Sequence, residues 1–129
     1  DSVLAAGAVA VIGREQTPTV QAFTVVIDVV GGSGFGALLE ALIPGGRYAT
    51  AGAIAGPIVE TDLRTVYLQD LTIFGCTYQP KEVFADLISL INQGSVRPLI
   101  SKTYSLRDIA TAQQDFACKR YPGKLVLLP

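Results

Sequence analysis

Three pairs of small residues follow apolar stretches at places where a strand could end: Gly31-Gly32, Gly52-Ala53 and Gly75-Cys76. Ligands bind at the carboxyl ends of the strands in an open parallel sheet, and a residue without Cβ lets backbone amides approach a flat ligand. The alternative interpretation is that tight turns after strands need glycine for a positive φ angle and hold no ligand. Three such turns in series favour a binding site, and the pattern leaves both interpretations open.

The residue types that are missing exclude several kinds of active site. The chain has no histidine, so it cannot form a Ser-His-Asp or Cys-His catalytic unit by itself. Cys76 and Cys118 lie far apart without further ligands nearby, so we expect no zinc site and interpret both as reduced core thiols. The 10 basic and 11 acidic side chains give a formal net charge of -1, which argues against nucleic acid as the main partner.

Asp28 stands inside the most apolar stretch and has two interpretations. Its carboxylate could approach a ribose hydroxyl, or it could accept backbone N–H hydrogen bonds within the turn, and we favour the second. Cys76 has no cationic neighbour in sequence, so we expect it to be packed rather than reactive. Tyr48, Tyr67 and Tyr78 could donate protons in a carbonyl reduction, but nothing distinguishes them from core tyrosines and none is proposed as catalytic.

The elements that must position these residues alternate between strands and helices. Apolar, β-branched runs predict strands at 23–30, 47–52, 71–76, 100–104 and 124–128. Helical spacing predicts helices at 33–43 with Ser33 as N-cap, at 61–69, at 80–93 with Pro80 in the first helical position, and after Ser105, which resembles a capping box with Asp108. Pro44 and the two glycines after it are expected to end the first of these helices. This alternation predicts a parallel α/β sheet with right-handed crossovers.

Three segments resemble the later part of the nucleotide-binding domain of medium-chain dehydrogenases/reductases. They are VVIDVVGGSGFGALLEALIPGGRYATAGAIAG (25–56), DLRTVYLQDLTIFGC (62–76) and AQQDFACKRYPGKLVLL (112–128). Within that superfamily the chain most resembles the quinone-oxidoreductase-like and zinc-type alcohol-dehydrogenase-like members, over essentially all 129 residues. The resemblance implies a partial Rossmann-like parallel sheet with flanking helices that lacks the first two strands and the glycine-rich loop. It also implies that 121–129 is a closing strand that returns to the catalytic domain.

The resemblance further implies contacts to a nicotinamide cofactor, NADP or NAD, mostly through backbone groups of the loops after three strands. The expected cofactor-binding residues are Gly31 and Gly32 near the ribose, Gly52, Ala53 and Ile54 near the nicotinamide, Gly75 and Cys76 near the carboxamide, and Lys124 near the phosphates. Lys124 could equally be a solvated charge at a strand edge. The glycines between 31 and 36 have the wrong spacing for the dinucleotide fingerprint, so we do not interpret them as a phosphate cradle.

Two functions are consistent with these features. The first is a segment of an oxidoreductase that transfers hydride between NAD(P)H and a quinone, enone, alcohol or aldehyde, with the segment alone inactive. The alternative is a non-catalytic nucleotide-binding or dimerisation module, because the strand at 71–76 resembles the family's edge strand that pairs with its twin in a homodimer.

The apolar run at 3–12 is too short to span a bilayer and lacks a basic flank, so we expect a soluble, cytoplasmic protein. The start at Asp1 without methionine leads us to expect an excised segment or a processed chain.

Overall fold

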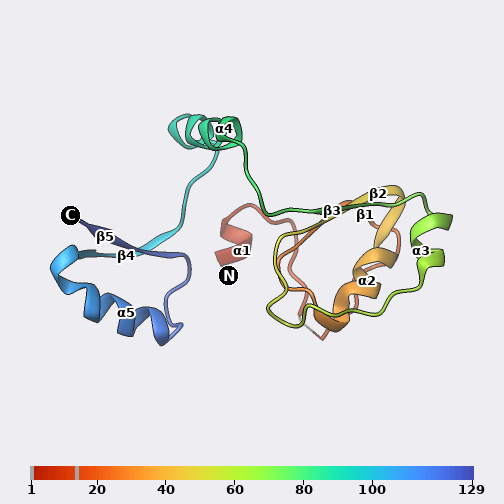
Figure 1. The fold of residues 1–129 in the computed structure, drawn as a ribbon, viewed down its shortest axis with the longest axis horizontal. Coiled ribbons are helices and arrows are strands. Elements are labelled where there is room, and N and C mark those ends of the chain that lie inside the picture. Colours follow the sequence, from red (N-terminus) through yellow and green to blue (C-terminus); the bar gives the residue numbers. More distant parts are fainter. Residues whose placement is uncertain (1, 14) are drawn as a thin grey trace. The chain divides into compact units, whose positions relative to one another are not determined.

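The computed structural model, drawn in Figure 1, describes residues 2–13 and 15–129. The chain divides into two compact units, and the boundary between them in the sequence falls after Tyr78. Asp1, on which the expectation of an excised segment or a processed chain rested, lies outside the described residues. No helix among the described residues is long and apolar enough to cross a membrane.

The first unit holds a three-stranded parallel sheet with the order β1-β2-β3 (Figure 1). Its elements are α1 (Ser2–Ala5), β1 (Phe23–Asp28), a 3-10 turn (Gly32–Gly34), α2 (Phe35–Glu40), β2 (Leu42–Thr50), α3 (Leu63–Leu68) and β3 (Thr72–Gly75). The strand order and the parallel pairing confirm the expected α/β half-sheet, with β1 and β3 at its two edges. Val11 and Ile12, at the end of the apolar run at 3–12, are exposed and lie outside any strand.

One face of this sheet carries the core. Val26 and Tyr48 are register partners and therefore point to the same side, where they pack with Leu39 of α2 and with Leu42. Phe35, Leu38, Val66 and Leu71 surround this cluster. Val25, Ile27 and Phe74 lie on the opposite face of the sheet, and their side chains are exposed in the part of the chain that the structure describes.

Three element boundaries in this unit differ from the predicted ones. β1 ends at Asp28, because the Asp28 side chain draws the next residues into a turn. The helix expected from residue 33 begins as a 3-10 turn, and α2 has no side-chain N-cap, so the prediction of Ser33 as N-cap is wrong. Pro44 lies inside β2 rather than before it. Phe23 pairs with Leu42 but Val25 pairs with Arg47, so β2 has a bulge between Leu42 and Arg47. This bulge accommodates Pro44, which has no N–H for the ladder.

The second unit holds α4 (Lys81–Asn92), β4 (Ile100–Ser105), a 3-10 turn (Leu106–Asp108), α5 (Ile109–Ala117) and β5 (Lys124–Leu128). β4 and β5 pair in parallel in a two-stranded sheet beside α5 (Figure 1). Pro80 was predicted in the first helical position of this helix. It is instead the N-cap of α4, with extended backbone, and the helix begins one residue later at Lys81. The Ser105 hydroxyl accepts from the Arg107 N–H at 3.4 Å and caps the 3-10 turn, so the expected capping box with Asp108 is not formed.

Candidate functional site at the carboxyl edge of the sheet

The three predicted glycine pairs meet at one edge of the sheet. Asp28, Thr50 and Gly75 are partners across β1, β2 and β3, so the three strands end at the same level. The ladders continue one residue further, because the Ala51 N–H donates to the Asp28 carbonyl at 2.9 Å and the Cys76 N–H donates to the Thr50 carbonyl at 2.8 Å. The loops that follow therefore lie side by side at the carboxyl edge, the usual ligand position in such sheets.

The loops after β1 and β2 are interlocked through their backbones. The Gly32 N–H donates to the Gly56 carbonyl at 3.0 Å, and the Ala55 N–H donates to the Val30 carbonyl at 2.9 Å. An isolated parallel bridge joins Gly31 and Gly56. These bonds tie the loops into one unit, so a displacement of one loop is transmitted to the other.

Most glycines here are required by the protein itself. Gly31 and Gly32 have φ angles of 64° and 77°, which residues with a side chain rarely adopt. A Cβ on Gly31 would lie 3.0 Å from the Gly56 carbonyl oxygen, and a Cβ on Gly32 would lie 3.0 Å from the Ala55 Cβ, both in the loop after β2. A Cβ on Gly52 would lie 2.7 Å from the Val29 carbonyl oxygen. Turn geometry and loop packing therefore explain these three glycines without a ligand.

Gly75 is different, because no heavy atom beyond its own chain neighbours lies within 4 Å of the position that its Cβ would occupy. Apolar side chains are exposed at the same edge: Ile54 is 91% exposed, and Val29 and Val30 are also exposed. An open backbone position beside exposed aliphatic groups fits a flat, partly apolar ring such as nicotinamide. Val29 and Val30 were not predicted at this edge, because their apolar side chains are typical of the strand that precedes it. An Asp followed by two residues and a glycine is nevertheless a pattern that can close a turn.

Asp28 accepts hydrogen bonds from within the protein, as favoured from the sequence. Its carboxylate accepts from the Val30 N–H at 2.8 Å and the Gly31 N–H at 3.0 Å, and the Tyr48 hydroxyl donates to its other oxygen. Burial raises the pKa of Asp28, but the hydrogen bonds from Tyr48, Gly31 and Val30 together outweigh burial and leave that pKa below its usual value. Burial, and then the contact with Asp28, raise the pKa of Tyr48 well above its usual value.

The remaining candidates are spread over both units. Tyr48 is fully buried and donates to Asp28, so it has no free hydroxyl for a substrate, whereas Tyr67 and Tyr78 are exposed. Cys76 is a half-buried free thiol at the carboxyl edge, and Cys118 is an exposed free thiol in the second unit, so the expectation that both are core thiols is wrong for Cys118. Lys124 begins β5 in the second unit, where its N–H donates to the Leu99 carbonyl at 2.8 Å.

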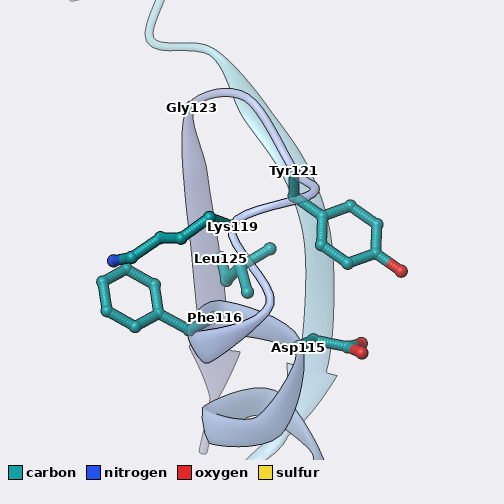
Figure 2. A pocket seen from close by; sticks show the side chains of 6 residues that line it. All are labelled: Asp115, Phe116, Lys119, Tyr121, Gly123 and Leu125. Carbon is teal, nitrogen blue, oxygen red and sulfur yellow. The ribbon is translucent and has the colours of Figure 1, made fainter.

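The second unit has a hollow of about 230 Å³ that none of the predicted site residues lines. Its lining residues are Asp115, Phe116, Lys119, Tyr121, Gly123 and Leu125. Figure 2 shows the Lys119 chain running to the Phe116 ring on one side, with its ammonium 3.8 Å from the ring centroid. Asp115 and Tyr121 lie on the other side (Figure 2), and Asp115 is already paired with Lys102 at 2.8 Å. These polar groups do not converge on the hollow, so it is not a candidate active site.

The described residues do not fit a metal site. Among residues 2–13 and 15–129, no group of three histidine, cysteine, aspartate or glutamate residues lies where it could hold an ion. The whole chain contains no histidine, and Cys76 and Cys118 belong to different units. No chemical step is therefore assigned to a metal held by these residues.

Two curated relatives match most of this chain. An acryloyl-coenzyme A reductase of Sulfurisphaera tokodaii is 30% identical over 116 residues, which are 89% of this chain and 35% of that protein. A quinone oxidoreductase of Pseudomonas aeruginosa is 28% identical over 114 residues, which are 81% of this chain and 35% of that protein. The chain thus spans about a third of the length of these relatives.

Solved structures share the same arrangement. The crystal structure of a Sinorhizobium meliloti 1021 protein, assigned as an alcohol dehydrogenase, is 40% identical with a TM-score of 0.81, over 99% of this chain and 38% of that one. A 2-octenoyl-CoA carboxylase reductase in complex with NADP and 2-octenoyl-CoA is 26% identical with a TM-score of 0.71, over 81% of this chain and 24% of that one. The parallel half-sheet is therefore a Rossmann-like one, as the resemblance implied.

The family model for zinc-binding dehydrogenases matches residues 6–127. This match agrees with the relatives above and confirms the resemblance to medium-chain dehydrogenases/reductases. The chain belongs to the zinc-binding dehydrogenase family.

Proposed function

We propose that this chain forms one wall of the nicotinamide site of an NAD(P)-dependent oxidoreductase, which transfers hydride between the cofactor and a quinone, enone, alcohol or aldehyde. The observation that carries the proposal is the carboxyl edge of β1–β3, where Gly75 leaves an open position and Ile54 is exposed beside the interlocked loops. The relatives that are named as acryloyl-CoA and quinone reductases, and the neighbour that holds NADP, support this class of reaction.

The cofactor, when bound, supplies the hydride chemistry, and the residues of this chain bind and orient it. Gly31 and Gly32 would face the ribose through their backbone, and Lys124 would lie near the phosphates. The other contacts, to the nicotinamide and its carboxamide, would come from Gly52, Ala53, Ile54, Gly75 and Cys76. Residues 1–129 hold no GxGxxG loop, so we expect these residues alone to show no hydride transfer, with 121–129 completing a catalytic domain that other residues provide.

A matched pair of isoleucine variants tests the site. Ile54 and Ile58 are 91% and 89% exposed on the same loop, and only Ile54 belongs to the proposed site. In the protein as expressed from its own gene, Ile54→Ala should weaken NADH or NADPH binding by about fivefold to tenfold, as expected for loss of part of an apolar contact. Ile58→Ala should leave the dissociation constant unchanged, and equal effects of the two variants would contradict the proposed site.

The other proposed properties are a homodimer through β3 and a cytoplasmic location. Exposed Ile73 and Phe74 on the edge strand β3 support pairing with a second copy.

The exposed edge of β3 also favours the alternative function, a non-catalytic dimerisation module. Saturable quenching of NADPH fluorescence by the native protein would support the oxidoreductase, whereas stable dimers without cofactor binding would support the alternative. Cell fractionation tests the location.

A further inference from the structure

We infer that Tyr48 is a positioning residue for cofactor binding, because its buried hydrogen bond to Asp28 holds the interlocked loops in place. The inference rests on the proposed function, since those loops are its proposed cofactor contacts. No part of the proposed site includes Tyr48 itself, which lies in β2 on the face of the sheet that carries the core.

The position of the Tyr48 hydroxyl is set by its surroundings. Tyr48 is fully buried, its backbone pairs with Val26 on one side and Ile73 on the other, and its ring packs edge-to-face on Phe35 of α2 with centroids 5.1 Å apart. A side chain held in this way has one place for its hydroxyl, and there the hydroxyl donates to the carboxylate of Asp28. Two strands and a helix therefore determine where the carboxylate lies.

The carboxylate transmits this position to the loops. Asp28 is 5% exposed, and both of its oxygens are engaged by protein donors, namely the Tyr48 hydroxyl and the N–H groups of Val30 and Gly31. Orientation of the carboxylate therefore fixes the turn at Val30 and Gly31. This turn places the Val30 carbonyl where it accepts from the Ala55 N–H, and the Gly32 N–H where it donates to the Gly56 carbonyl.

Loss of the hydroxyl should therefore loosen both loops while the core stays filled. Tyr48→Phe keeps the ring and its contact with Phe35, and leaves Asp28 a buried carboxylate with one donor fewer. The lost hydrogen bond is to a charged group and holds both loops, so a loss of about tenfold in NADH or NADPH affinity, which corresponds to about 1.4 kcal/mol, is the expected effect. Tyr48→Phe should also speed hydrogen exchange in the peptide that spans residues 28–34.

Tyr104→Phe is the matched control, because it removes another tyrosine–carboxylate hydrogen bond, the 2.6 Å contact with Asp115 in the second unit. Both variants should lower the melting temperature of the native protein. Only Tyr48→Phe should raise the dissociation constant for the cofactor and the exchange rate at 28–34. Equal dissociation constants for wild type and Tyr48→Phe would overturn the inference, and so would a rise of the same size in Tyr104→Phe.

Variants at Asp28 provide the rescue. Asp28→Asn keeps an oxygen that can accept from Val30 and Gly31 and an amide that can donate to the Tyr48 oxygen, so affinity should stay within a few-fold of wild type. Asp28→Leu removes every acceptor and should lose affinity at least as much as Tyr48→Phe. If wild type binds no cofactor, the proposed function fails, and the exchange rates alone then decide whether Tyr48 positions the loops.

Discussion

The carbonyl oxygen of Val29 lies 2.7 Å from the place that a Cβ atom on Gly52 would take. This distance is shorter than real Cβ atoms tolerate, and the obstacle is backbone rather than a flexible side chain. Gly52 is thus required by the close packing of the loop after β2 on the end of β1. Gly75, at the end of the next strand, has open space at the same position. Two glycines that look alike in sequence therefore have different reasons to be there.

The first prediction separates these reasons. Gly52→Ala should lower the free energy of unfolding by about 1–3 kcal/mol, because the clash with Val29 forces the two loops apart. Gly75→Ala should change the free energy of unfolding by less than about 0.5 kcal/mol, since nothing lies near the new methyl group. Urea unfolding of the native protein measures both values. A Gly52→Ala protein as stable as wild type would show that the loops can shift without cost.

The order of the elements was predictable from sequence because periodicity is strong in this chain. The apolar run before Asp28 predicted a strand, and the structure places β1 there with Val26 in the core, although Val25 and Ile27 on its other face are exposed. The boundaries were harder, because they depend on single hydrogen bonds and pairings. The Asp28 side chain ends β1 two residues early, and the bulge opposite Phe23 carries Pro44 inside β2, neither of which a periodic pattern records.

The site was predictable only as a set of loops. Three glycine pairs at strand ends indicated which loops meet, and the parallel register brings them to one edge. The reason for each glycine was not predictable, because it depends on the distance to another loop that is remote in sequence. The proposed role of Tyr48 was likewise not predictable from the sequence, because its hydrogen-bond partner Asp28 lies 20 residues away on another strand. The stripe of α4, which includes Val83, Phe84 and Leu87, correctly predicted a helix, yet these side chains are exposed.

The second prediction concerns pH. Hydrogen bonds outweigh burial and hold the pKa of Asp28 below its usual value of 3.8, so the folded state holds that proton less tightly than the unfolded chain. The resulting stability is fully present above about pH 5 and is lost as pH falls below 3.8 towards the folded pKa. Asp28→Asn lacks this contribution at every pH. The difference in unfolding free energy between wild type and Asp28→Asn should therefore narrow as pH is lowered.

A series of urea melts from pH 7 to pH 3 measures that difference. Asp62 and Asp115 also have lowered pKa values, through hydrogen bonds to Arg64 and Lys102 respectively, but they contribute equally to both proteins and cancel. A constant difference across the series would mean that Asp28 is not held ionised by its donors.

The third prediction tests Lys124 as a phosphate contact. Lys124→Ala should raise the dissociation constant for NADPH by a factor of about two to five, as expected for one exposed charge pair, and the effect should shrink in high salt. Lys119→Ala is the control, because the Lys119 ammonium already lies over the Phe116 ring (Figure 2) and Lys119 belongs to no proposed contact. If the two lysine variants bind NADPH equally, Lys124 is a solvated charge, the alternative that the sequence left open.

The fourth prediction concerns the edge strand β3. The Cys76 N–H points to β2, and successive N–H groups of a strand alternate in direction, so the N–H of Phe74 also points to β2 whereas that of Ile73 points to the free edge. Ile73→Pro should therefore remove a donor from the proposed dimer ladder while leaving the β2–β3 pairing intact. Sedimentation should show a shift from dimer to monomer in this variant. Phe74→Pro should instead break the β2–β3 pairing and lower the melting temperature, and a wild-type protein that sediments as a monomer at high micromolar concentration would refute the dimer.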